Sequence, residues 1–392
     1  MILAHLIGAQ TLPNLLAVLA LRPTQVIHVT SDAKRFAAPI RNLEKALALA
    51  GLKPAFQTLA LPSVNPTPAE VANALTNLPP ELKPTILNLT GGTKLMGLGA
   101  HTWAELNYVP SLYVDTAART FTQTSTPSLP SLQTLPQVAA TLSLEIVLTA
   151  HGVPANKLQG KAPVAAELAF GREAATAWAQ DQACSAWKNT LRTAWFLPNG
   201  YPLPEAWRTA VPIPANAAAQ LAQAAVTLGW ATIDHLGRFT PAPPLLSAGD
   251  QQKRNAFVSD LLQNLEGGWF ELYVAGLLLA TPHFHDLRWS VEATTDREDL
   301  ALGENDLVAL DRRTLSPVFI SCKSSTSFPK PLEHVFSLRQ RASHFGGTFA
   351  QAVLCISRTH NAEDAKRILG FCKAASVTPL FGDEAIAAWL NR

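Results

Sequence analysis

The stretch from Thr85 to Met96, TILNLTGGTKLM, joins an apolar β-type run to a helical pattern through two glycines. Such a strand-loop-helix unit is typical of open parallel sheets. Further β-type runs and helical patterns alternate with it before residue 124. The runs are Ile2 to Ile7, Gln25 to Thr30, Ala55 to Leu59 and Ser111 to Val114, and the other helices start near Asn14, Ala33 and Pro68. This alternation predicts a Rossmann-like α/β domain over residues 1–140.

The loop Gly91-Gly92-Thr93-Lys94 follows the carboxyl end of its predicted strand, where open α/β sheets bind ligands. The glycines allow close approach of the backbone, the free amides at the helix start attract negative charge, and Lys94 adds an ammonium group. The loop therefore favours a phosphate-bearing ligand. Its spacing is not that of a Walker loop, so nucleotide hydrolysis is not implied. The alternative interpretation is a glycine turn with a solvated lysine.

Polar residues also follow the first two predicted strands. Gln10 comes after the first strand, and Thr30 and Ser31 come at the end of the second. Because the carboxyl ends of parallel strands meet at one edge, we expect Gln10, Ser31 and Thr93 to line one shallow basin of uncharged donors. Such a basin suits an extended polyphosphate or oligonucleotide better than a small metabolite. Each of these residues could instead cap a helix.

The composition describes a globular protein of two or three domains. Its 392 residues are 48% apolar and 15% charged, with 31 Lys and Arg against 29 Asp and Glu. A charged fraction this low predicts surface that packs against a partner chain, so we expect a homo-oligomer. No segment is strongly basic, and any nucleic-acid binding must come from the local placement of charge.

Neither a membrane anchor nor a disulfide framework is indicated. The apolar N-terminal stretch has no Lys or Arg before Arg22 and contains polar interruptions, which disagrees with a signal peptide. Elsewhere no run approaches the roughly 20 apolar residues of a membrane span. The cysteines have no paired spacing, and we interpret them as small buried hydrophobic residues. They are Cys184, Cys322, Cys355 and Cys372. We expect a cytoplasmic protein without membrane contact.

The segment 141–250 follows a Pro- and Ser-rich stretch at residues 125–140, whose composition is typical of a linker. It contains an Ala-rich helical pattern, Ala215 to Leu228, and two short β-type runs around a turn at Leu236-Gly237. A helix followed by a hairpin resembles a winged helix, a fold that often binds DNA. The helical pattern contains no Lys or Arg, which favours the alternative of a spacer packed between two other domains.

Residues 251–392 predict a second α/β domain, with a mixed sheet. The predicted strands are Leu287 to Ala293, Leu307 to Asp311, Val318 to Cys322, Ala352 to Ser357 and Val377 to Leu380, and the helices are Gly268 to Leu279, Leu332 to Phe345, Ala362 to Ala375 and Asp383 to Leu390.

Carboxylates and a lysine are spaced along this domain in a way that suits metal-dependent phosphodiester cleavage. That chemistry needs carboxylates to hold divalent cations and a lysine to stabilise or deprotonate the attacking water. Asp306, in Glu304-Asn305-Asp306, opens one predicted strand, and Lys323 closes the next across a turn at Arg312-Arg313. Strand pairing would bring them together, with Glu271 arriving from the preceding helix. The alternative interpretation is that Glu271, Asp306 and Lys323 are surface charges at the ends of helices and strands.

The glycine loop in the N-terminal domain, followed along the chain by the carboxylates and lysine of the C-terminal domain, resembles the arrangement in the CRISPR-associated Rossmann fold (CARF) nucleases. In that family a ligand-sensing domain precedes a restriction-endonuclease-like domain of the PD-(D/E)XK type. The resemblance lies in the Leu-Thr-Gly-Gly-Thr-Lys segment, in Gly-Trp-Phe-Glu, and in Glu-Asn-Asp followed by a strand ending in x-x-Lys. It implies a homodimer that binds a cyclic oligoadenylate, in particular cyclic tetra-adenylate. Binding would activate a Mn²⁺- or Mg²⁺-dependent endonuclease that cleaves DNA and/or RNA in type III CRISPR antiviral defence.

The resemblance also assigns residues to the two sites. The ligand site is implied at Thr93 and Lys94, and around them at Gly91, Gly92, Gln10, Thr30 and Ser31. The catalytic and metal site is implied at Glu271, Asp306 and Lys323, with Glu304 as a further carboxylate and Cys322 beside the lysine as part of the metal site.

One position departs from the family pattern, because Ser321 stands where a glutamate usually precedes the lysine by two residues. A hydroxyl is a poorer ligand for a hard cation than a carboxylate, so one metal site is weakened. The main alternative is therefore a cyclic-oligoadenylate-sensing regulator or binding module with a degenerate nuclease domain. A repair or restriction nuclease unconnected to signalling is a third interpretation, which the loop Gly91–Lys94 opposes.

Overall fold

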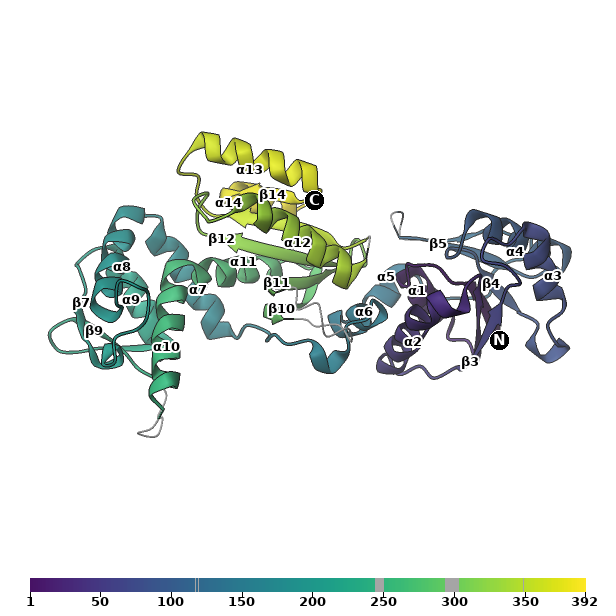
Figure 1. Cartoon of the computed structure of the whole chain (residues 1–392), viewed down its shortest axis with the longest axis horizontal. Helices are drawn as coiled ribbons and strands as arrows, with labels where there is room; N and C mark the ends of the chain where they lie inside the picture. The colour runs from purple at the N-terminus through teal and green to yellow at the C-terminus, as the bar shows by residue number, and fades with distance from the viewer. Residues whose placement is uncertain (117, 119, 244–249, 293–302, 348) are drawn as a thin grey trace.

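The computed structural model describes the chain except for residues 117, 119, 244–249, 293–302 and 348. It is an elongated α/β protein with three parts (Figure 1). The N-terminal part has a six-stranded sheet, the middle part is mainly helical with a small sheet, and the C-terminal part has a five-stranded mixed sheet. The predicted fold class is confirmed. The part boundaries near residues 140 and 250 stay predictions.

The N-terminal sheet has the strand order β3-β2-β1-β4-β5-β6. All neighbouring pairs are parallel except β5 with β6. The strands are β1 (Ile2–Leu6), β2 (Gln25–Thr30), β3 (Ala55–Ala60), β4 (Ile86–Asn88), β5 (Ser111–Asp115) and β6 (Thr120–Gln123), and the helices are α1 (Leu12–Leu21), α2 (Ala33–Leu49), α3 (Pro68–Thr76) and α4 (Lys94–Leu106). Every element predicted from the sequence is present. The antiparallel edge strand β6 was not predicted, because only one of its four side chains is even partly buried and it carries no apolar run.

The middle part has three helices and a three-stranded antiparallel sheet in the order β7-β9-β8. The elements are α7 (Ala165–Trp178), α8 (Asp181–Trp195), β7 (Val211–Pro212), α9 (Ala217–Thr227), β8 (Ala231–Ile233) and β9 (Arg238–Pro241). These elements lie at the far end of the molecule from the N-terminal sheet (Figure 1), whereas the beginning of the segment 141–250 forms α6 (Leu144–Ala150), which lies between the other two parts. The middle part packs through α7 on α11 of the C-terminal part, so closely that a Cβ added at Gly171 would lie 2.5 Å from the backbone nitrogen of Tyr273.

The C-terminal sheet has the order β10-β11-β12-β13-β14, antiparallel from β10 to β12 and parallel from β12 to β14. The strands are β10 (Phe284–Glu292), β11 (Glu304–Asp311), β12 (Ser316–Lys323), β13 (Gln351–Ile356) and β14 (Thr378–Phe381), and the helices are α10 (Gln251–Gln263), α11 (Trp269–Leu279), α12 (Pro331–Gly346), α13 (Ala362–Ala375) and α14 (Gly382–Leu390). The predicted mixed sheet is confirmed. Ala293, the last residue of one predicted strand, lies outside the described residues.

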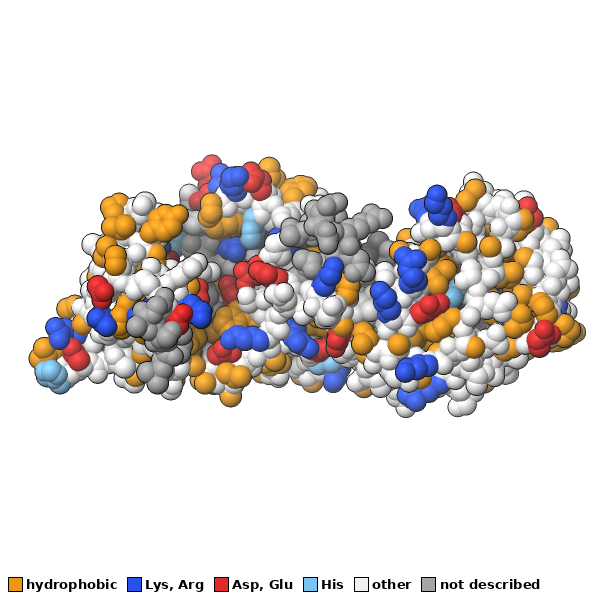
Figure 2. All heavy atoms as spheres, turned by 60° about the horizontal axis from the view of Figure 1, so that its bottom comes forward, with side chains coloured by type: hydrophobic (Ala, Val, Ile, Leu, Met, Phe, Trp, Pro, Cys, Tyr) orange, Lys and Arg blue, Asp and Glu red, His pale blue; other side chains and the backbone are white. Residues whose placement is uncertain are grey.

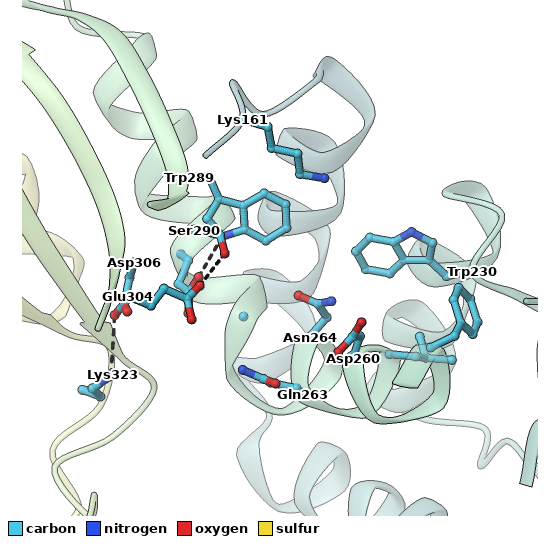
Figure 3. Close-up of a pocket in the computed structure, with 14 residues that line it drawn as sticks. Lys161, Trp230, Asp260, Gln263, Asn264, Trp289, Ser290, Glu304, Asp306 and Lys323 are labelled. Atoms are coloured by element: carbon cyan, nitrogen blue, oxygen red, sulfur yellow. Dashed lines mark hydrogen bonds and ion pairs between the residues drawn. The ribbon is translucent and has the colours of Figure 1, made fainter. Parts of the chain in front are cut away.

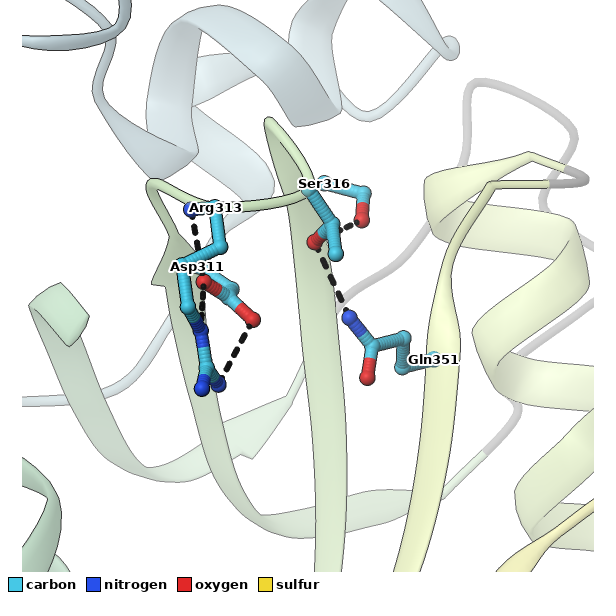
Figure 4. A network of polar contacts seen from close by, with 5 residues as sticks. Asp311, Arg313, Ser316 and Gln351 are labelled. Carbon is cyan, nitrogen blue, oxygen red and sulfur yellow. Dashed lines mark hydrogen bonds and ion pairs between the residues drawn. The ribbon is translucent and has the colours of Figure 1, made fainter. Parts of the chain in front are cut away.

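The turn between β11 and β12 sets how these two strands pair (Figure 4). Asp311 is buried and accepts hydrogen bonds from the backbone and guanidinium of Arg313. On the next strand, Ser316 bonds to Thr314, whose hydroxyl also accepts from Gln351 of β13. These contacts fix the start of β12 between its two neighbours and so fix the register at the other end of the sheet.

The N-terminal and C-terminal parts share one hydrophobic core. Two short helices, α5 (Leu135–Ala139) and α6 (Leu144–Ala150), follow the N-terminal sheet. Helix α6 packs on α2 and also on β12 and α12, so its side chains belong to both parts. The interface between the two parts is therefore a packed part of the fold.

The surface and the cysteines agree with the composition. Basic and acidic side chains are interspersed on the face in Figure 2, with no single-signed patch over the whole of it. All four cysteines are free and buried, as predicted. Within the described residues, no helix is long and apolar enough to cross a membrane.

Candidate functional sites

The glycine loop, Gly91 to Lys94, packs tightly against the end of β1. A Cβ added at Gly91 would lie 2.0 Å from the carbonyl oxygen of Leu6, and Gly92 has a positive φ of 73°. The two glycines are therefore required by the fold of the loop itself. Thr93 caps α4 by accepting a hydrogen bond from the backbone N–H of Met96, and both Thr93 and Lys94 are exposed. The loop thus presents a hydroxyl, an ammonium and a helix N-terminus to solvent.

The loop after β1 lies against the glycine loop, because a Cβ added at Gly8 would lie 3.0 Å from the backbone nitrogen of Gly92. Gln10 and Ser31 are partly exposed, and strands β2, β1 and β4 are parallel neighbours, so three strand ends meet as expected. Thr30 is different. Its side chain is fully buried, and its hydroxyl accepts from the backbone N–H of Asp32, so Thr30 shapes the turn and does not face the basin.

Glu271 enters the C-terminal site from the first turn of α11. The chain reaches this turn through a π-helical segment, Asn264–Gly268, which changes the direction of the helix after α10. The carboxylate accepts a 2.8 Å hydrogen bond from the indole N–H of Trp289 on β10. Burial, with the charge of Asp306 nearby, raises the pKa of Glu271 to about 8 against the smaller lowering effect of that indole bond. Glu271 therefore holds a proton at neutral pH unless a cation is present.

Asp306 and Lys323 lie together, as the spacing predicted. The Lys323 ammonium is 3.5 Å from Asp306 Oδ2. The same oxygen accepts hydrogen bonds from the backbone N–H of Cys322 at 2.6 Å and from the hydroxyl of Ser321 at 2.9 Å. The Asp306 carboxylate is thus held by three donors from the end of β12.

The Cys322 side chain is a poor metal ligand here. It is 5% exposed, and burial together with its neighbour Cys355 raises the pKa of its thiol well above the usual value. Since a thiol binds metal as the thiolate, any contribution of Cys322 must come from its backbone.

His334 was not found from the sequence. It lies on the first turn of α12, and its Nε2 is 2.8 Å from the hydroxyl of Ser321. Ser321 uses its one proton toward Asp306, so His334 Nε2–H donates to the serine oxygen. Burial and the Lys323 charge lower the pKa of His334 to about 4, which keeps the ring neutral. Nothing in the spacing marked His334, because its position depends on how α12 crosses the sheet.

Glu271, Asp306 and Lys323 line a cavity of about 700 Å³ between the C-terminal sheet and the middle part (Figure 3). Glu304 is exposed at its edge and accepts a hydrogen bond from Ser290. The opposite wall carries Trp230 of the middle part and Asp260 of α10, whose pKa is raised by burial. Trp289 and Lys161, which lies over the Trp289 ring, also face the cavity and were missed by sequence reasoning.

The residues present fit one divalent cation rather than a closed metal cage. Among the described residues, no three His, Cys, Asp or Glu side chains are close enough to form a site by themselves. Glu271 and Asp306 do line the same cavity, and their charges interact strongly enough to raise the Glu271 pKa. Two carboxylates completed by water and substrate phosphate are a usual Mg²⁺ or Mn²⁺ environment. The arrangement suits metal-assisted attack on a phosphodiester.

Fold and geometry together define an α/β protein with a polar strand-end loop in one part and a carboxylate–lysine group in another, the two parts sharing a hydrophobic core. Residues 2–143 match the family model for the Card1 CARF domain. The predicted resemblance to CARF proteins is confirmed. No curated protein matches the sequence.

Solved structures share the fold over nearly the whole chain. Protein VC1899 from Vibrio cholerae has a TM-score of 0.72 at 14% identity, with 99% of this chain and 96% of that chain covered. Can2 from Sulfobacillus thermosulfidooxidans, solved in complex with cyclic tetra-adenylate, has a TM-score of 0.64 at 19% identity, with 100% and 95% covered. A type III CRISPR defence DNA nuclease activated by cyclic oligoadenylate has a TM-score of 0.54 at 15% identity, with 92% and 46% covered. The chain thus shares its α/β fold with these proteins.

Proposed function

We propose that the protein is a metal-dependent endonuclease that cyclic tetra-adenylate activates in type III CRISPR defence. The observation that carries the proposal is the convergence of Glu271, Asp306 and Lys323 on one cavity in a chain whose N-terminal part matches the CARF family model. The structural likeness to Can2, which was solved with cyclic tetra-adenylate, supports the choice of activator.

The substrate in this proposal is a polynucleotide, DNA or RNA. A second cavity of about 580 Å³ adjoins the first and shares Glu271 and Lys323 with it. It carries Lys188 and Arg358 with Trp178, and the first cavity carries Lys161 with Trp230 and Trp289, so cationic groups and indoles lie together on both sides of the carboxylates. Cations contact phosphates and aromatic rings stack on bases, which is the pairing a polynucleotide strand needs.

Each residue has a role in this mechanism. Glu271 and Asp306 would hold a divalent cation, which when bound would lower the pKa of a water and neutralise charge on the phosphate. Three donors at the end of β12 fix the orientation of the Asp306 carboxylate. Lys323 stabilises the negative charge that develops on the phosphate during attack. The Trp289 indole keeps one Glu271 oxygen in place.

The activator site in this proposal is the basin formed by Thr93, Lys94, Gln10 and Ser31, repeated in a homodimer. A ligand with symmetric phosphates needs a symmetric site, and a two-fold axis would place two such loops opposite each other. Leu95 and Leu98, on α4 beside the loop, are 47% and 56% exposed, and these apolar side chains suit a subunit interface.

The test is plasmid nicking and RNA cleavage with purified protein, each with and without Mn²⁺ and cyclic tetra-adenylate. The proposal predicts cleavage that depends on both. Cleavage without activator would indicate a nuclease unconnected to signalling. Tight activator binding without any cleavage would indicate the alternative, a sensing regulator, which Ser321 in place of a glutamate specifically favours.

A further inference from the structure

Helix α12 contacts both sites, one at each end. His334 on its first turn bonds to Ser321, which in turn bonds to Asp306. At its other end, Gly347 terminates the helix beside the loop after β1. At about 1.5 Å per helical residue, the distance along the axis from His334 to Gly347 is roughly 20 Å.

The sensor end is a tight contact between three segments. A Cβ added at Gly347 would lie 2.5 Å from the ring of His151 and 3.0 Å from the side-chain oxygen of Gln10. Gly347 also has a positive φ of 72°. Next to it, the hydroxyl of Thr11 donates to the carbonyl of Ala150 at 2.8 Å. The loop that presents Gln10 is therefore attached to the ends of both α6 and α12.

One buried polar atom at this contact has no partner. His151 Nε2 is buried and makes no hydrogen bond within the part of the chain that the structure describes. An unsatisfied buried nitrogen costs free energy. A displacement of the loop after β1 that gave His151 Nε2 a partner would remove that cost.

The catalytic end holds Asp306 through two connections. The first is the chain of donors from His334 through Ser321 to Asp306 Oδ2. The second comes from Arg341, which is 8% exposed and donates at 2.8 Å to the side chain of Asn305, the residue before Asp306. A shift of α12 must move both His334 and Arg341, and Asp306 with them.

We propose that α12 transmits activation, with His334 as the positioning residue for Asp306. This inference rests on the proposed function. Ligand binding at the basin displaces the loop that carries Gln10, and the contact with Gly347 passes the displacement to α12. Helix shifts of about 1–2 Å are the usual size of such transitions. His334 then reorients Asp306 through Ser321.

The test compares the parent with Gly347→Ala, His334→Ala and His334→Gln. Phe336→Ala is the matched control, because Phe336 is on the same helix and 47% exposed. Three quantities are measured: the cleavage rate with and without cyclic tetra-adenylate, activator affinity without metal, and amide hydrogen exchange of β12 without metal. The Cys322 N–H, bonded to Asp306, reports on the catalytic end independently of activity.

The expected results differ by variant. Gly347→Ala still binds the activator, but its activation ratio falls at least about tenfold, and the activator no longer changes exchange of β12. His334→Ala lowers kcat about tenfold or more with KM unchanged, and His334→Gln recovers much of the loss because its amide N–H replaces Nε2–H. Phe336→Ala behaves as the parent.

A parent-like activation ratio in folded Gly347→Ala would overturn the inference, as would His334→Gln no better than His334→Ala. If Gly347→Ala does not fold, His151→Ala takes its place, with the same expected loss and the same refuting result. A parent that never cleaves with activator and Mn²⁺ would instead overturn the proposed function, and this inference with it.

Discussion

Replacing Ser321 by glutamate should destabilise the metal-free protein and make its stability depend on the metal. Ser321 is 1% exposed and lies beside Asp306, whose carboxylate already pairs with Lys323, so the new carboxylate would be buried without a cation of its own. The glutamate would be protonated instead. Protonating a carboxylate of normal pKa, about 4.3, costs about 3.7 kcal/mol at pH 7. Overpacking adds about 1–3 kcal/mol. At roughly 2–4 °C per kcal/mol, the melting temperature should fall by about 9–27 °C.

Thermal unfolding in EDTA and in Mn²⁺ measures this effect. A metal concentration about 100 times the dissociation constant returns about 2.7 kcal/mol, so Mn²⁺ should raise the melting temperature of Ser321→Glu more than that of the parent. Ser321→Ala is the control, since it removes the link between His334 and Asp306 without adding charge and should cost about 1–3 kcal/mol in either condition. Equal melting temperatures for Ser321→Glu and the parent in EDTA would refute the placement of Ser321 beside the metal carboxylates.

Four further results are expected. Lys94→Ala should weaken activator binding about 10- to 150-fold, whereas Lys323→Ala should leave that affinity unchanged and lower turnover about a hundredfold, as separate binding and cleavage titrations would reveal. Because the pKa of Glu271 is raised to about 8, Mn²⁺ binding must displace a proton, and calorimetry should find affinity rising toward pH 8 and levelling above it. Because the pKa of Glu271 is higher in the folded protein, its stabilising effect is complete below about pH 4.5 and is lost as the pH rises through 8. The melting temperature of the metal-free protein should therefore fall over that range. Light scattering should find a dimer without ligand, and a monomer at micromolar concentration would contradict the two-fold activator site.

Local patterns in the sequence were enough to predict both sheets. Alternating apolar runs and helical patterns located the strands of the N-terminal sheet, and Lys94 was correctly expected at the start of a helix. The pairing of Asp306 with Lys323 was also predictable, because a short turn between two strands forces the residues at their far ends together. The edge strand β6 was missed because it buries too little to produce an apolar pattern.

What only the tertiary structure decided depends on contacts between segments far apart in the chain. The sequence marked Thr30 as a ligand residue, but packing buries it. The sequence gave no indication of His334, Trp289 or Trp230. His334 reaches the site because α12 crosses the sheet, and Trp289 because β10 pairs with β11. Trp230 reaches it because α7 docks on α11. Short-range periodicity determines which elements form. Long-range burial of their faces determines which side chains meet, and that is where this protein joins its two sites.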